Sequence, residues 1–213
     1  MNPAPQPCWS CRGPIPKPVP FCPTCQTIQP LDPNLDFFGL FMIKPGYQID
    51  RGQVESLYRQ LQQQFHPDRF ATKSPKERRY SLEHVTRLNE AYRTLKDPLT
   101  LALYILQQGG VTMDEGHPTT PTDPAFLMEA MELREGLEEL DLNTDGASDA
   151  LDAMRKEVQG RCKREIDGLS ALFDDYFSNN NQAALESAAA GVNRLRYHNR
   201  FLEELDQREE SLF

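Results

Sequence analysis

The sequence predicts an all-α protein of 213 residues with a small metal-binding knuckle of four cysteines at its N-terminal end. From residue 36 onward, apolar residues recur at intervals of three and four, the spacing of one helix face, and no strand pattern of useful length occurs. Residues 1–35 differ, because they are rich in proline, hold four of the five cysteines and have almost no periodicity. This segment cannot build a core by hydrophobic burial alone.

The four N-terminal cysteines, Cys8, Cys11, Cys22 and Cys25, form two CxxC pairs separated by ten residues. Each pair can hold a tetrahedral cation through two thiolates, so the two pairs predict one zinc ion bound by four sulfurs. Four thiolates leave no open coordination position, which makes the predicted site structural. Two disulfides and an iron-sulfur cluster are the alternatives, the first disfavoured in a reducing cell. Cys162 is expected to be an ordinary helical residue.

The first long helix is predicted over about residues 51–65 and ends at the tripeptide His66-Pro67-Asp68. Proline lacks an amide hydrogen and disfavours helical geometry in the residue before it, so the tripeptide is predicted to form a turn. The apolar face of this helix consists of Val54, Leu57, Tyr58, Leu61 and Phe65.

The second long helix is predicted to begin after Ser74 and Pro75, with Glu77 placed to complete a capping box. A short loop joins the two helices, so they should form an antiparallel hairpin. A shorter helical segment follows from residue 98 and stops at two glycines. The predicted apolar stripe of the second helix is Leu82, Val85, Leu88, Ala91, Tyr92 and Leu95.

The remainder of the chain is predicted to form a linker over residues 111–122 and then three helices, the smallest number that encloses a shared core. Asp123 and Pro124 cap the first of these, residues 140–149 make a turn, and long helices follow over about 148–177 and 182–210. The apolar residues of the first helix include Phe126, Leu127, Met131, Leu133 and Leu137.

Charge is distributed unevenly, at +1 for residues 1–35, +3 for 36–110 and −13 for 111–213, which gives the net charge of −9. This balance argues against a nucleic-acid binder, since phosphate neutralisation needs clustered Lys and Arg. No apolar run is long enough to span a membrane. The first residues show neither a signal core nor a transit-peptide pattern, so we expect the cytoplasm, with the mitochondrial matrix as the alternative for a processed form.

His66 and Asp68 could serve as a catalytic pair, a metal site or a docking element, or could lie on an incidental turn. Catalysis would need a nucleophile or a metal, and the sequence has neither a GxSxG elbow nor an HExxH helix. His84, His117 and His198 show no metal-binding spacing with His66. Catalysis is therefore disfavoured.

The helix before His66-Pro67-Asp68, the "FATKSP" segment after it and the "RLNEAYRTLKDP" run in the second helix resemble the J domain of co-chaperones. The resemblance covers residues 36 to about 106. It implies that His66, Pro67 and Asp68 form the loop that triggers ATP hydrolysis on a DnaK-type chaperone, by binding rather than catalysis. Arg59 and Arg69 would add positive charge beside this loop.

The runs "DPAFLMEAMELREGLEEL" and "NRLRYHNRFLEELDQ" resemble the C-terminal domain of HscB-type co-chaperones of iron-sulfur cluster assembly. The resemblance implies a four-Cys extension (1–35), a J domain (36–110), a linker (111–122) and a domain that binds an IscU-type scaffold (123–213). Three apolar residues in different directions around one helix cannot all face inward, although a core face and a solvated acidic face are the plainer interpretation. The implied scaffold-binding residues are Leu127, Met128, Met131, Glu132, Glu135, Glu139 and Tyr197.

The function implied by this resemblance is that of an adaptor without enzymatic activity. It would bring the cluster scaffold to a specialised DnaK-type chaperone and stimulate the ATPase of that chaperone. The alternatives are a general J protein for unfolded clients, disfavoured by the lack of a Gly/Phe-rich segment, and a metal-dependent enzyme that uses His66 and Asp68.

Overall fold

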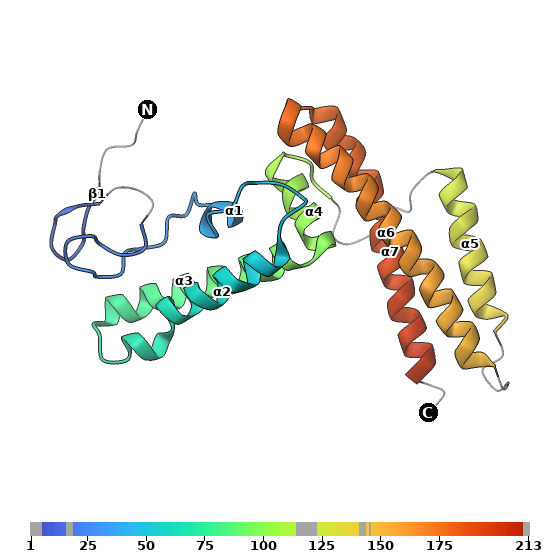
Figure 1. The fold of residues 1–213 in the computed structure, drawn as a ribbon, viewed down its shortest axis with the longest axis horizontal. Helices are drawn as coiled ribbons and strands as arrows, with labels where there is room; N and C mark the ends of the chain where they lie inside the picture. The colour runs from blue at the N-terminus through green and yellow to red at the C-terminus, as the bar shows by residue number, and fades with distance from the viewer. Residues whose placement is uncertain (1–5, 16–18, 114–122, 141–143, 145, 211–213) are drawn as a thin grey trace. The chain divides into compact units, whose positions relative to one another are not determined.

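The computed structural model describes residues 6–15, 19–113, 123–140, 144 and 146–210, and within these ranges most residues from Phe37 onward are helical (Figure 1). The predicted all-α fold is confirmed. Contacts divide the chain into two compact units. The first contains residues 1–45 and 49–97, and the second contains residues 46–48 and 98–213.

The first unit begins with a small antiparallel pair of strands, β1 (Gln6–Pro7) and β2 (Pro14–Ile15), which belongs to the four-cysteine extension. A one-turn helix, α1 (Phe37–Leu40), follows, and the Asp36 side chain caps it by accepting a hydrogen bond from the backbone N–H of Gly39. The two strands are too short to form a layer of their own, so the helices make the main core.

The helical hairpin of the first unit consists of α2 (Arg51–Phe65) and α3 (Pro75–Lys96), which lie side by side (Figure 1). The two helices contact each other near their middle, where the ring of Tyr58 stacks on the ring of Tyr92 with 4.0 Å between centroids. The predicted capping box is confirmed, because Ser74 accepts from the N–H of Glu77 while the Glu77 carboxylate accepts from the N–H of Ser74. A single turn of 3-10 helix, η1 (Pro67–Phe70), closes the hairpin.

The predicted apolar stripe of α3 is wrong at Leu82, which is 60% exposed. The buried face of α3 is centred instead on Tyr80, Ser81 and His84, and it continues through Leu88. Leu82 lies about 200° around the helix from His84, since each residue turns the chain by about 100°. The reason for the difference is that the N-terminal extension covers Tyr80 and His84, two residues that an apolar count leaves out.

The second unit consists of α4 (Pro98–Gln108), α5 (Pro124–Glu138), α6 (Ala147–Asn179) and α7 (Gln182–Glu210). Helices α6 and α7 form a long antiparallel pair, and α4 packs on α7. Asp123 caps α5 as predicted, by accepting from the N–H of Ala125. The bounds of α6 and α7 agree with the predicted ranges within two residues.

The predicted linker falls mostly outside the described residues, since 114–122 are not among them, and so does part of the predicted turn at 140–149. The domain boundaries at 35, 110 and 122 stay predictions. Among the helices of the described residues, none is long and apolar enough to cross a membrane.

Candidate metal centre and docking surfaces

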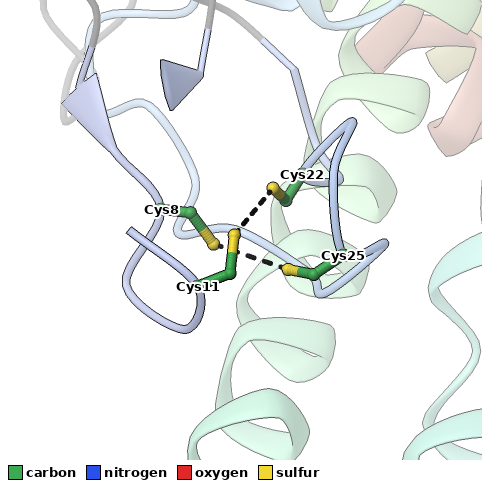
Figure 2. A group of neighbouring side chains, drawn as sticks. All are labelled: Cys8, Cys11, Cys22 and Cys25. Carbon is green, nitrogen blue, oxygen red and sulfur yellow. Dashed lines mark hydrogen bonds between the residues drawn. The ribbon is translucent and has the colours of Figure 1, made fainter. Parts of the chain in front are cut away.

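The four N-terminal cysteines lie together, with all four sulfur atoms within 4.8 Å of one another (Figure 2). Cys8 Sγ lies 3.7 Å from Cys25 Sγ, and Cys11 Sγ lies 3.7 Å from Cys22 Sγ. A tetrahedral zinc site with bonds of about 2.3 Å has sulfur-to-sulfur edges of about 3.8 Å. The cluster therefore has the dimensions of a four-thiolate zinc site.

Both CxxC loops have the same backbone hydrogen-bonding pattern. The N–H of Cys8 donates to the carbonyl of Gly13 over 2.8 Å, and the N–H of Cys22 donates to the carbonyl of Thr27 over 3.0 Å. Each loop turns through one residue of positive φ, Arg12 in the first and Gln26 in the second. The repeated turn brings both cysteines of each pair to one side, which explains how two separate CxxC pairs make one site.

The environment of the sulfurs favours thiolates at some positions and opposes them at others. The Thr27 hydroxyl, 3.3 Å from Cys25 Sγ, lowers the pKa of Cys25 to about 6. The pKa of Cys11 is raised to about 12: the Gly13 N–H acts to lower it, but the neighbouring sulfurs outweigh that effect. Four thiolates at this spacing repel one another unless a cation lies between them. The donor set thus fits a bound cation, and none of the four is in a disulfide.

Cys162 is a helical residue, as predicted. It is buried on α6, and its sulfur lies 3.6 Å from the Asn199 side-chain oxygen. Burial raises the pKa of its thiol.

The His66-Pro67-Asp68 turn is exposed and internally ordered. The N–H of Asp68 donates to His66 Nδ1 over 3.3 Å, and the N–H of Arg69 donates to the His66 carbonyl over 3.0 Å. The Asp68 carboxylate, 91% exposed, lies 3.5 Å from His66 Nδ1. The turn therefore presents the His66 imidazole and the Asp68 carboxylate to a partner.

The two arginines beside the turn have different local partners. Arg59 pairs with Glu55 one turn earlier in α2, over 2.5 Å. Arg69 donates to the carbonyl of Gln63 over 3.1 Å, which satisfies one free carbonyl at the end of α2. Both side chains are exposed, so their charge is accessible beside the turn.

A metal-dependent active site at His66 and Asp68 would need at least one further ligand. Among the described residues, the only group of three or more His, Cys, Asp or Glu side chains with metal-binding spacing is the four-cysteine cluster. The role of the turn stays a prediction.

The outward face of α5 carries an apolar patch formed by Leu127, Met128 and Met131, which are 37%, 66% and 61% exposed. The opposite face is buried through Phe126, Ala130, Leu133 and Leu137. Three exposed carboxylates, those of Glu132, Glu135 and Glu139, border the patch on the same helix or at its end. We call these six residues the α5 face. An exposed apolar patch with a charged rim is typical of a protein-docking site.

Tyr197 of α7 is not one of the α5 face residues, and its side chain is half-buried against α5. Its hydroxyl donates to the carbonyl of Ala130 over 3.0 Å, and its ring packs edge-on against Phe126. Burial raises the pKa of the phenol. Tyr197 therefore holds α5 on α7, and only part of its side chain is available to a partner.

A polar cluster that sequence inspection missed also holds α5 in place. Glu129 of α5 pairs with Arg161 of α6, and the same carboxylate lies 3.2 Å from Nε2 of the buried His198 of α7. Burial acts to raise the pKa of Glu129, but Arg161 and His198 lower it below its usual value. The three residues come from three helices, so no sequence spacing could reveal the cluster.

Comparison with known proteins assigns the chain to a described family. Residues 122–206 match the model of the "HSCB C-terminal oligomerisation domain" family. The chain is 35% identical over 198 residues to the iron-sulfur cluster co-chaperone protein HscB homolog of Arabidopsis thaliana, covering 93% of this chain and 72% of that one. It is 37% identical to the co-chaperone protein HscB homolog of Aliivibrio fischeri, covering 84% and 99%. The crystal structure of human co-chaperone protein HscB superposes with a TM-score of 0.83 at 30% identity, covering 95% and 98%.

Proposed function

The chain belongs to the HscB family of co-chaperones, and on that basis we propose that it is an adaptor of iron-sulfur cluster assembly. It binds an IscU-type scaffold protein, brings the scaffold to a specialised DnaK-type chaperone and stimulates the ATPase of that chaperone. The chain itself catalyses no reaction.

One observation carries this proposal: the two predicted docking surfaces lie on separate compact units of one chain. The His66-Pro67-Asp68 turn belongs to the first unit, and the α5 face belongs to the second. Two partners can therefore bind at the same time without competing for one surface. Tethering raises the effective concentration of the scaffold at the chaperone, which increases the apparent affinity without any new contact.

The two surfaces have different chemistry, which suits different partners. The turn offers the Asp68 carboxylate and the His66 imidazole, with Arg59 and Arg69 beside them, so charge-assisted hydrogen bonds would dominate there. On the α5 face, Leu127 and the two methionines would bury apolar area, and the glutamates would select a basic partner surface. A general J protein for unfolded clients would not need this acidic rim.

The four cysteines are proposed to hold one zinc ion with a structural role. The sulfur spacing and the absence of disulfides fit a cation, and four protein ligands leave no position for a substrate. Metal analysis of the purified protein tests the identity of the ion. About one equivalent of zinc per chain is expected, and an equivalent of iron with sulfide would contradict the assignment.

The test of the adaptor function is a reconstituted ATPase assay with a DnaK-type chaperone and an IscU-type scaffold. The wild-type chain should raise ATP turnover, and His66→Gln should abolish the increase while scaffold binding stays unchanged. Gln64→Ala, an exposed neighbour on α2, is the matched control and should stimulate normally. Full stimulation by His66→Gln would refute the assignment of the His66-Pro67-Asp68 turn as the chaperone-binding element.

A further inference from the structure

The four-cysteine extension contacts the end of α2 directly before the His66-Pro67-Asp68 turn. Phe65, the last residue of α2, is buried, and the ring of Phe21 from the extension stacks on it with 5.6 Å between centroids and 10° between planes. The His84 ring is also parallel to Phe65, at 4.5 Å. The Phe65 carbonyl accepts a hydrogen bond from the Ser81 hydroxyl over 2.6 Å. The residue that fixes where the turn begins is thus held on several sides.

The extension also contacts the first half of α3, which follows the turn. The buried His84 donates from Nε2 to the carbonyl of Gln29 over 3.0 Å. Trp9 packs edge-on against Tyr80, and the Lys76 ammonium lies 4.4 Å from the centroid of the Trp9 ring. The extension therefore contacts both helices that flank the turn, at the end of α2 and in the first half of α3.

The packing of the extension against the helical hairpin is interrupted beside the contact of Phe21 with Phe65. A cleft of about 460 Å³ lies beside it, lined by Pro33, Leu35 and Met42 as well as by Leu61 of α2. Packing between the extension and α2 is incomplete there. The Phe21 to Phe65 stack and the His84 hydrogen bond thus connect the extension to the helices that flank the turn, together with the contacts that Trp9 makes with Tyr80 and Lys76.

The cysteine cluster fixes the extension residues that make these contacts. Trp9 directly follows Cys8, and Phe21 directly precedes Cys22. The Gln29 side chain donates to Cys8 Sγ over 3.4 Å, while its carbonyl receives the His84 hydrogen bond. A cation held by the four sulfurs would hold these three residues in place, since four-thiolate knuckles draw their folding energy from the metal.

We infer that Phe21, with Trp9 and Gln29, positions the His66-Pro67-Asp68 turn, so that the four-cysteine extension sets how well the chain engages the chaperone. This inference rests on the proposed function of the turn. If the contacts are lost, the end of α2 samples more orientations and only a fraction of molecules has the turn in the competent arrangement. The apparent affinity for the chaperone falls by that fraction, whereas stimulation at saturation is unchanged.

The experiment compares the full chain with Phe21→Ala, with Phe21→Tyr, which keeps the stacking ring, and with Thr24→Ala. Thr24 is the matched control, because it is an exposed residue of the second CxxC loop and does not line the cleft beside Phe65. Hydrogen exchange is measured at the amides of Arg69 and Ala71, both hydrogen-bonded within the turn. ATPase stimulation is titrated with each variant, and scaffold binding is measured alongside.

Phe21→Ala should speed exchange in the turn and raise the half-maximal concentration for stimulation, each by about threefold to tenfold, the range expected for loss of one aromatic pair. Maximal stimulation, scaffold binding and exchange in the middle of α2 should not change. Phe21→Tyr and Thr24→Ala should behave like the wild type. Removal of the metal by a chelator should reproduce the exchange result of Phe21→Ala.

Unchanged exchange at Arg69 and Ala71 in Phe21→Ala would overturn the inference, even if the wild-type chain proves inactive on the chaperone. The same would follow if Phe21→Tyr or Thr24→Ala changed the exchange as much as Phe21→Ala, since neither removes the stacked ring on Phe65. A wild-type chain that does not stimulate the chaperone at all would instead refute the proposed function. The two failures are therefore distinguishable.

Discussion

Replacing both Leu127 and Met131 by alanine should weaken scaffold binding strongly without weakening the fold. Their exposed fractions, 37% and 61%, together equal roughly one whole side chain, and burying one such chain is worth about 1.5–3 kcal/mol. Because each 1.4 kcal/mol is about a factor of ten, the scaffold Kd should rise by about 10-fold to 150-fold. Isothermal titration calorimetry with an IscU-type scaffold measures this change directly.

The matched control is Leu82→Ala, which removes another exposed leucine on a helix of the other unit. It should leave the scaffold Kd unchanged. Alanine is a good helix former and the replaced side chains are largely exposed, so the melting temperature of the double variant should stay close to that of the wild type. A wild-type Kd in the double variant, with the fold intact, would refute the docking role of the α5 face.

Three further predictions concern the fold itself. Removal of metal by a chelator should unfold the extension but leave the long helices folded, as followed by limited proteolysis with helical circular dichroism; cooperative loss of all helical signal would contradict this. Burial lowers the pKa of His198, whereas a histidine in the unfolded chain titrates near pH 6.5. At pH values below about 6.5 the unfolded chain therefore binds a proton more readily than the folded chain. The free energy of unfolding should consequently decrease as the pH is lowered through this range. His198→Gln should reduce that slope in urea unfolding between about pH 7.5 and pH 5, and an unchanged slope would assign it to other groups. Gly109→Ala would place a Cβ atom 2.1 Å from Leu185 Cδ2, so it should destabilise the second unit by about 1–3 kcal/mol, whereas Gly168→Ala, which meets no neighbour, should not.

The local signals in the sequence were sufficient for most of the helices. Ser74 with Glu77 and Asp123 with Pro124 are caps whose chemistry acts within one turn, and the structure has helices beginning at both places. Pro67 ends α2 for an equally local reason. The cysteine cluster was also predictable, because two short CxxC pairs specify their own loops and need only to meet.

Features that depend on contacts between distant segments were not predictable in this way. Leu82 looked like a core residue by spacing alone, but the extension covers the face of α3 that carries Tyr80 and His84. Nothing in the composition of either segment indicates that Phe21 stacks on Phe65, 44 positions later in the chain. Tertiary packing, and not the spacing of apolar residues alone, therefore determines which face of α3 is buried.

The inner side of α5 explains how its outer side can remain apolar and exposed. Glu129, paired with Arg161 and lying beside His198, fixes the helix to α6 and α7 from below, and Tyr197 adds a hydrogen bond to the α5 backbone. A helix held by these directional contacts does not need to turn Leu127 or the methionines inward to stay attached. Tyr197 would then act on scaffold binding mainly by fixing α5. Removal of its hydroxyl should consequently change the stability of the second unit more than it changes the contacts made by the α5 face.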